Sequence, residues 1–281
     1  MKSCRQFSGA CLALALLILC STAQAAPAAR LWERWSAHDP ASTSTIDHAN
    51  WHALLQQYVV RSDDGVNRFA YRRLLESETE RKRLREYLNR MSQIEISQYN
   101  RDQQRAYWIN LYNAITIEVV LDDYPVESIR DIRSGLFSPG PWKRKLIEIE
   151  NEELTLDDIE HRILRPVWQD PRVHYAVTCA SIGCPNLQPE AFTADHAEIL
   201  LHRGADQFVN HPRGARVVDG KLQVSSIYRW FEADFGGSET GVIDHLKRYA
   251  RSALRKALDG IDRISGDDYD WSINAAENHK S

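Results

Sequence analysis

Cysteine is scarce in this chain, which has five among 281 residues. Cys4, Cys11 and Cys20 lie near the start, so only Cys179 and Cys184 fall in the remaining sequence. Two cysteines cannot supply the several disulfides that hold a small secreted scaffold together. No second close pair of ligands accompanies them, which makes metal ligation the weakest interpretation of the pair, and no metal site is predicted.

The sequence also lacks the short motifs that mark several large enzyme classes. GxSxG, HExxH, a P-loop and the dinucleotide-binding fingerprint are all absent. The sequence therefore predicts no cofactor. An excess of positive charge is missing too, because 35 basic residues face 39 acidic ones. This mildly acidic balance does not predict a nucleic acid partner.

What the chain does have at its start is the pattern of an export signal. Lys2 and Arg5 form a short positive region, residues 10–20 are uncharged and apolar, and residues 23–25 (Ala-Gln-Ala) suit a signal peptidase. The apolar run is too short for a comfortable membrane span. We therefore expect residues 1–25 to be a cleaved secretory signal peptide, with no stable membrane insertion afterwards. The expected location is periplasmic or secreted.

The remaining sequence is long enough for one large domain. Residues 26–45, rich in Ala, Ser, Thr and Pro, are predicted to form a flexible N-terminal segment, and residues 46–281 a single globular domain. The strongest helix is predicted over residues 102–121, which are apolar nearly all round after Ala106 and indicate a buried central helix. Asp219-Gly220 between apolar residues predicts a β-hairpin. We expect an α+β fold, a mainly helical single domain around that helix with a small antiparallel sheet or hairpins.

Two carboxamides on the predicted central helix are candidate ligand contacts. Asn110 and Asn113 are three residues apart and therefore share a face of the helix. A buried amide without partners costs roughly 1 to 3 kcal/mol, so both need hydrogen bonds. They either form the polar floor of a pocket or brace the backbone of neighbouring loops.

A second predicted helix, over residues 156–165, carries Glu160 and His161. At 100° per residue, Glu160 lies within the apolar arc and points inward, whereas His161 lies about 140° from Leu156 and does not. An inward carboxylate either has a raised pKa suited to acid or base work or is neutralised by an arginine or several donors. Glu160 is a candidate catalytic group. His161 is a candidate ligand contact, with a solvated surface histidine as the alternative.

The densest reactive cluster contains His174, Cys179 and Cys184, all candidate catalytic residues. A strand predicted over residues 173–178 places His174 and Cys179 on opposite faces, so His174 is a poor base for Cys179 but could meet Cys184. The competing interpretation is a Cys179–Cys184 disulfide, which an oxidising compartment favours. A bridge across so short a loop contributes only roughly 2 kcal/mol. A reactive thiol is the other alternative.

Four segments together resemble the domain of unknown function 547 family. They are residues 106–114 (AYWINLYNA), 156–165 (LDDIEHRILR), 173–177 (VHYAV) with the two cysteines, and 225–235, which precede a glycine and include the candidate ligand contact Asp234. Their order and spacing agree with the family, most strongly over about residues 98–234. The resemblance implies a domain and no reaction.

Three hypotheses follow. The first is a binding or envelope-assembly module with bridged cysteines, in which the polar residues bind a small or extended polar ligand or an envelope component. The second is a cysteine-dependent hydrolase or acyl transferase acting on an amide or ester, with His174 or His161 as base and an asparagine stabilising an oxyanion. The third is a purely structural network. Binding is favoured, because cysteines in an oxidising compartment are expected to pair.

Overall fold

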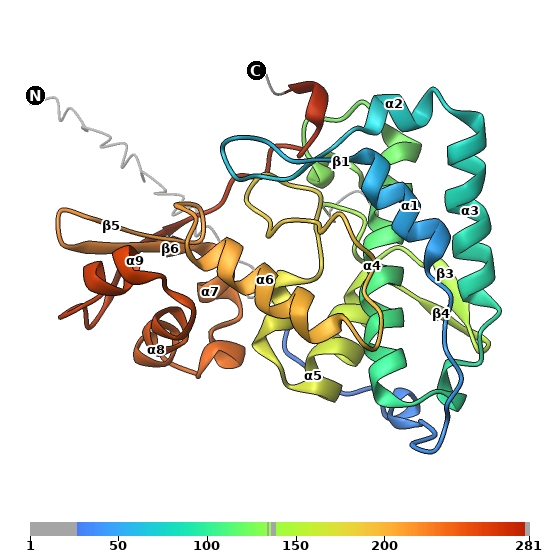
Figure 1. The fold of residues 1–281 in the computed structure, drawn as a ribbon, viewed down its shortest axis with the longest axis horizontal. Helices are drawn as coiled ribbons and strands as arrows, with labels where there is room; N and C mark the ends of the chain where they lie inside the picture. Colours follow the sequence, from blue (N-terminus) through green and yellow to red (C-terminus); the bar gives the residue numbers. More distant parts are fainter. Residues whose placement is uncertain (1–26, 134, 136–138, 279–281) are drawn as a thin grey trace, which may run out of the picture.

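A computed structural model describes residues 27–133, 135 and 139–278. The predicted signal peptide, with Cys4, Cys11 and Cys20, lies outside these residues. The described chain is mainly helical with three small sheets, which confirms the α+β prediction (Figure 1). Within the described ranges, no helix combines the length and apolar character needed to cross a membrane.

The helices and strands are distributed along the whole described chain. The α-helices are α1 (Ala49–Tyr58), α2 (Tyr71–Leu75), α3 (Glu78–Ser92), α4 (Arg101–Asp123), α5 (Arg165–Trp168), α6 (Ala197–Val209), α7 (Ser226–Trp230), α8 (Glu239–Tyr249) and α9 (Ser252–Ala257). The strands are β1 (Val59–Val60), β2 (Arg68–Phe69), β3 (Ile147–Ile149), β4 (Glu152–Leu154), β5 (Ala215–Val218), β6 (Lys221–Ser225) and β7 (Ile264–Asp268). Short 3₁₀-helices are η1 (Glu33–Ser36), η2 (Ile96–Gln98), η3 (Ile129–Asp131), η5 (Pro171–Tyr175), η6 (Glu232–Phe235) and η7 (Ala276–Asn278), and η4 (Asp158–Leu164) is a π-helix.

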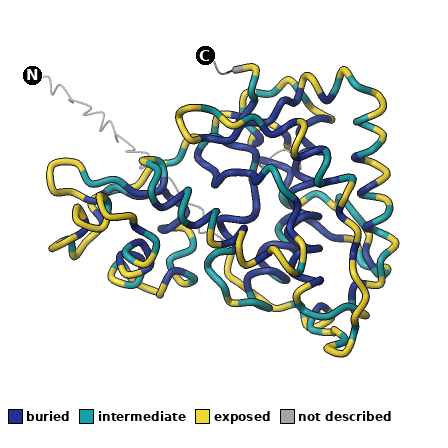
Figure 2. The backbone as a smooth tube through the Cα atoms, in the orientation of Figure 1, coloured by how far each residue is buried: buried dark blue, intermediate teal, exposed yellow. Residues whose placement is uncertain are grey.

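The central helix α4 is the structural axis of the larger hydrophobic cluster. It begins after Asn100, whose side chain accepts a hydrogen bond from the backbone N–H of Gln103, as an N-cap residue does. Apart from Glu118, its residues from Gln103 to Leu121 are buried, and Figure 2 shows this buried path through the middle of the molecule. The predicted buried central helix is thus confirmed.

A second hydrophobic cluster lies beside the three-stranded sheet. Strands β5 and β6 form the antiparallel hairpin predicted at Asp219-Gly220, where φ is +50° and +69°, as a tight hairpin turn requires. Strand β7 then pairs with β6 in parallel. Helix α6 joins the two clusters, because its first half belongs to the α4 cluster and its second half packs with the sheet and α8.

Two predicted elements differ from the structure. Residues 171–175 form the 3₁₀-helix η5 where a strand was expected, because the Asp170 side chain caps the N–H of Arg172 and Pro171 favours the first helical turn. Residues 158–164 form a π-helix instead of an α-helix, and the N–H of Arg165 bonds to the carbonyl of Glu160, five residues earlier. Pro166 lies within this continuous helical stretch, at the start of α5.

Candidate functional site

A cavity of about 650 Å³ is lined by residues of both hydrophobic clusters. Its wall includes five of the predicted site residues: Glu160, His161, His174, Cys179 and Cys184. The other lining residues are Pro27, Tyr112, Arg130, Gly135, Pro139, Trp142, Lys143, Asp157, Val177, Pro185, Ile227, Trp230, Phe231, Tyr269 and Trp271. The π-helix, the 3₁₀-helix η5 and the cysteine loop therefore meet at one concave surface, which we call the main cavity.

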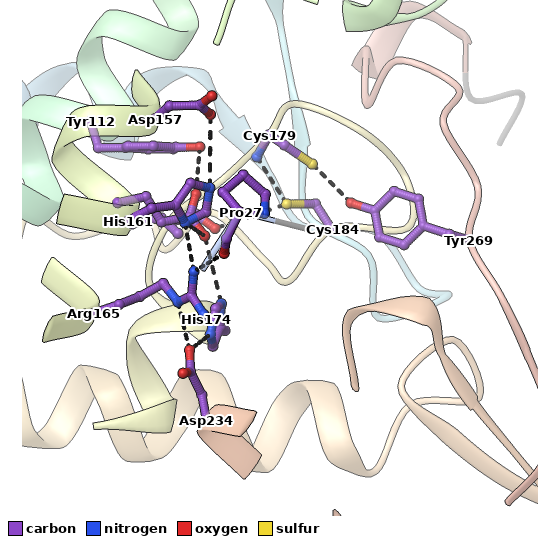
Figure 3. A network of polar contacts seen from close by, with 12 residues as sticks. Pro27, Tyr112, Asp157, His161, Arg165, His174, Cys179, Cys184, Asp234 and Tyr269 are labelled. Atoms are coloured by element: carbon purple, nitrogen blue, oxygen red, sulfur yellow. Dashed lines mark hydrogen bonds and ion pairs between the residues drawn. The ribbon is translucent and has the colours of Figure 1, made fainter. Parts of the chain in front are cut away.

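His174 is held between two carboxylates at one end of the main cavity. Its Nε2 lies 2.7 Å from Oδ2 of Asp234, and its Nδ1 lies 3.6 Å from Oε1 of Glu160. The ring stacks on Phe231, with centroids 4.3 Å apart and planes 20° apart. Burial alone would lower the pKa of His174, but the two carboxylates raise it above its ordinary value. The two carboxylates, one on each side of the ring, thus favour the positively charged form of His174 next to the cavity, and Figure 3 shows His174 beside Asp234.

Glu160 points inward, as predicted, and is ionised. The Tyr112 hydroxyl on α4 donates to its Oε2 at 3.0 Å. Burial alone would raise the pKa of Glu160, yet the neighbouring imidazoles of His161 and His174 and the guanidinium of Arg165 hold it at about 2. Of the two alternatives in the sequence, the carboxylate neutralised by partners is therefore the one observed.

Arg165 connects this group of residues and fixes the tautomer of His161. Its Nε donates to Asp234 at 2.6 Å, and one terminal nitrogen donates to the Pro27 carbonyl at 2.7 Å. The same nitrogen lies 3.0 Å from Nδ1 of His161. Because arginine only donates, Nδ1 must accept, and a neutral His161 carries its proton on Nε2. Burial lowers the pKa of His161 to about 4, which keeps the ring neutral at pH 7.

The predicted outward direction of His161 is wrong, because the residue is 6% exposed and lines the main cavity. The i→i+5 bonding of the π-helix widens each turn, so successive side chains are separated by less than the 100° used for an α-helix. Glu160 and His161 can then both face the interior. Asp157, the residue just before the π-helix, also lines the cavity, and its carboxyl Oδ1 lies 3.8 Å from Nε2 of His161. Burial and the nearby Glu160 charge raise the pKa of Asp157 to about 6.

The N-terminal segment predicted to be flexible runs along this π-helix. The backbone N–H of Arg30 donates to the His161 carbonyl at 2.9 Å, and that of Trp32 to the Arg162 carbonyl at 3.0 Å. Trp35, in η1, is 3% exposed and packs edge-on against Trp108 of α4. The segment therefore contributes Pro27 to the main cavity, although it lies outside residues 98–234, which resemble the family most strongly.

The two cysteines lie at the other end of the main cavity, and both are free thiols, so their disulfide stays a prediction. The backbone N–H of Cys179 points at Sγ of Cys184, 2.9 Å away. Sγ of Cys179 lies 2.8 Å from the Tyr269 hydroxyl and 3.0 Å from the Ser181 hydroxyl. Burial alone would raise the pKa of Cys179, but the Cys184 thiol and these hydroxyls hold it below its ordinary value. Burial and the neighbouring Cys179 raise the pKa of Cys184.

The simplest catalytic dyad of the sequence hypothesis is not formed. Both ring nitrogens of His174 face carboxylates, and no hydrogen bond within the described chain joins His174 to either sulfur. His161 is likewise engaged by Arg165. A thiol nucleophile in this arrangement has hydroxyl donors beside it and no imidazole base.

Asn110 and Asn113 both brace loop backbone, the alternative that the sequence left open. Asn110 donates to the carbonyl of Phe192 at 2.7 Å and accepts from its N–H at 2.9 Å. Asn113 donates to the Ala176 carbonyl at 2.9 Å and accepts from the Thr178 N–H at 2.8 Å. Neither is among the residues that line the main cavity. Asn113 instead fixes the backbone that leads directly into Cys179.

The sequence reasoning missed several residues of this site. The contact between Arg165 and His161 could have been predicted, because Arg165 follows His161 by four residues on the same helix. Tyr269 carried no signal, since it lies 90 residues after Cys179 and reaches it only through the tertiary fold. The aromatic wall of Trp142, Trp230 and Trp271 is also assembled from distant segments.

Comparison with known proteins identifies one family. Residues 96–209 match the model of a protein family of unknown function, DUF547, the family that the sequence resemblance indicated. The matched region contains α4, η4, η5 and both cysteines, whereas Asp234 and Tyr269 follow it. No curated protein and no solved structure matches the chain.

Proposed function

We propose that this is an exported, periplasmic or secreted protein that binds a small or extended polar ligand in the main cavity. The observation that carries the proposal is the buried, charged pair of Glu160 and His174 in the cavity wall. Buried charges cost several kcal/mol in desolvation and are weak stabilisers of a fold. Groups of this kind gather where a site must recognise something polar.

The polar groups in the wall suit an amide. His161 carries a proton on Nε2, and its distance of 3.8 Å from Asp157 is too long for a good hydrogen bond, so this donor keeps capacity for a ligand oxygen. Oε1 of Glu160 lies 3.6 Å from His174 and 3.9 Å from His161, so it keeps capacity to accept a ligand N–H. One neighbouring donor and one acceptor match the C=O and N–H of a carboxamide.

The aromatic wall suits the remainder of such a ligand. Trp230 and Trp271 stack with centroids 5.6 Å apart, and Trp142 meets Trp271 edge-on at 5.9 Å. Flat apolar surfaces beside a few oriented polar groups are typical of ligand sites of this volume. The ligand class is therefore an amide-bearing molecule with a flat apolar face, such as a peptide or an N-acetylated sugar.

Indole N–H resonances offer a direct test of this proposal. Trp142, Trp230 and Trp271 line the main cavity, whereas Trp51 and Trp108 are buried elsewhere and serve as internal controls. N-acetylated dipeptide amides and N-acetylglucosamine would be titrated into ¹⁵N-tryptophan-labelled protein. We expect saturable shifts confined to the cavity indoles and weakened at least tenfold by Glu160→Gln. The proposal would be refuted if neither the cavity indoles nor the control indoles shifted, or if both sets shifted equally.

A cysteine-dependent hydrolase or acyl transferase is the less well supported function. Such an enzyme needs a base that can take the thiol proton and return it to the leaving group. Within the described residues, the side-chain partners of Sγ of Cys179 are the Tyr269 and Ser181 hydroxyls and the Cys184 thiol, and no imidazole is among them. Binding is therefore favoured over acyl transfer.

A further inference from the structure

The cysteine loop is held in place by bonds that do not involve sulfur. The N–H groups of Ile182 and Gly183 both donate at 2.8 Å, to the carbonyls of Ser272 and Asp270 respectively. Asn113 fixes the entering backbone at Thr178. A loop that is braced on both sides gains little from a disulfide between its own ends, whose contribution is about 2 kcal/mol for so short a span. The close approach of Cys179 and Cys184 therefore calls for another explanation than stability.

The two thiols differ in ways that matter for chemistry. Cys179 is partly exposed and has two hydroxyl partners, whereas Cys184 is only 5% exposed. Hydroxyl donors stabilise a thiolate, which is the attacking form of cysteine in exchange reactions. The pKa of Cys179 is lowered while that of Cys184 is raised, which is the same asymmetry.

We propose that Cys179 and Cys184 form a thiol–disulfide exchange site, with Cys179 as the attacking thiol and Cys184 as the resolving thiol, for a disulfide that enters the main cavity. The substrate class is a small disulfide or a peptide disulfide with flat groups, because Trp230 and Tyr269 stand together at this end with centroids 4.9 Å apart. This activity does not depend on the amide-binding proposal, since it uses neither Glu160 nor His161.

The exchange balances in two steps. The Cys179 thiolate attacks one sulfur of the substrate R–S–S–R′, forming a Cys179–S–S–R bond and releasing R′S⁻, which takes up a proton. The Cys184 thiol loses its proton to solvent and attacks the Cys179 sulfur, which forms the Cys179–Cys184 disulfide and releases RS⁻. The substrate disulfide is reduced to two thiols, and the protein dithiol is oxidised. The backbone N–H of Cys179, 2.9 Å from Sγ of Cys184, favours the second thiolate as it forms.

The test uses 4,4′-dithiodipyridine, an aromatic disulfide whose released thiopyridone is read by absorbance. The full chain would carry Cys4→Ala, Cys11→Ala and Cys20→Ala, so that only Cys179 and Cys184 react. We expect two equivalents of thiopyridone and no retained pyridyl mass. Cys184→Ser should release one equivalent and keep the label, and Cys179→Ser should react at least tenfold more slowly than Cys184→Ser.

Other outcomes overturn the proposal. Retention of pyridyl groups on both cysteines would show that no resolution takes place, and faster labelling in Cys179→Ser than in Cys184→Ser would reverse the two roles. Tyr269→Phe should slow labelling of Cys179 severalfold, while Tyr99→Phe, away from the cavity, should not. Equal labelling rates in these two phenylalanine variants would show that the Tyr269 hydroxyl does not activate Cys179, which would contradict the proposal.

Discussion

Nε2 of His174 lies 2.7 Å from Oδ2 of Asp234, a carboxylate sixty residues further along the chain. The same oxygen accepts a hydrogen bond from Arg165 at 2.6 Å. One carboxylate thus meets a guanidinium and an imidazole whose side chains are only 4% and 2% exposed. This contact joins the helix η6, which follows the family-matched region, to the helices η5 and α5 inside it.

Asp234→Asn tests the energetic weight of this contact. The variant leaves the buried charges of Arg165 and His174 without their shared partner, and breaking such a buried pair costs about 3 kcal/mol. We expect a loss of that size in the free energy of unfolding, measured by urea denaturation with an unchanged m-value. Asp244→Asn, at an exposed position on α8, is the matched control and should change stability by less than about 0.5 kcal/mol. Equal losses in both variants would contradict the account.

His161 is expected to make the protein acid-sensitive. Because burial lowers its folded-state pKa from 6.5 to about 4, the unfolded chain binds the proton first as the pH falls. The free energy of unfolding should therefore fall between pH 6.5 and 4, by up to about 3 kcal/mol from this residue. His161→Gln should flatten that fall, whereas His38→Gln, at an exposed position, should leave it intact. Parallel pH–stability curves for wild type and His161→Gln would exclude the buried neutral ring.

Asn113→Ala should destabilise the protein and loosen the cysteine loop. The substitution leaves the buried N–H of Thr178 and the carbonyl of Ala176 without partners, at roughly 1 to 3 kcal/mol for each group. Stability would be measured by urea denaturation, and loop mobility by hydrogen exchange at Ala180 and Ser181. Asn89→Ala, exposed on α3, is the control. Unchanged exchange at the loop would show that Asn113 does not brace it.

Gly183→Ala should separate Tyr269 from Cys179. A Cβ atom at this position would lie 2.8 Å from the backbone N and 2.9 Å from the backbone O of Asp270, so the segment that carries Tyr269 must move. We expect a stability loss of about 1 to 3 kcal/mol together with slower alkylation of Cys179. Asn89→Ala, at an exposed position on α3 and away from the main cavity, is the control. A Gly183→Ala variant with wild-type stability and alkylation rate would argue against the close contact between Gly183 and the Asp270 backbone.

Local sequence signals predicted the parts of the fold that depend on neighbouring residues. The 102–121 helix prediction agrees with α4 because its apolar pattern depends on residues only a few positions apart. The Asp219-Gly220 turn was predictable for the same reason, since it requires positive φ at two adjacent positions. Glu160 was correctly placed inside, because the apolar residues around it set the inner face.

The sequence predictions were wrong where the type of helix or a long-range contact determines the local structure. The prediction for residues 156–165 used the α-helical period of 3.6 residues per turn. It therefore did not anticipate the π-helix, in which His161 faces inward. The β-branched and aromatic residues of 173–178 favour a strand, but the Asp170 cap and Pro171 produce η5 instead. Tyr269 reaches Cys179 because β7 and the chain after it pack beside the cysteine loop. A local sequence pattern cannot predict such a long-range contact.

The charged residues, the aromatic wall and the cysteine pair line one cavity, which we propose to be a ligand-binding site. The most direct test is the alkylation rate of Cys179 by iodoacetamide, in the chain that lacks Cys4, Cys11 and Cys20. It would be measured with and without a saturating amount of the N-acetylated probe that shifts the Trp230 and Trp271 indoles. We expect at least tenfold protection in the wild type and much weaker protection in Glu160→Gln at the same probe concentration. A rate that the bound probe leaves unchanged would contradict the proposal.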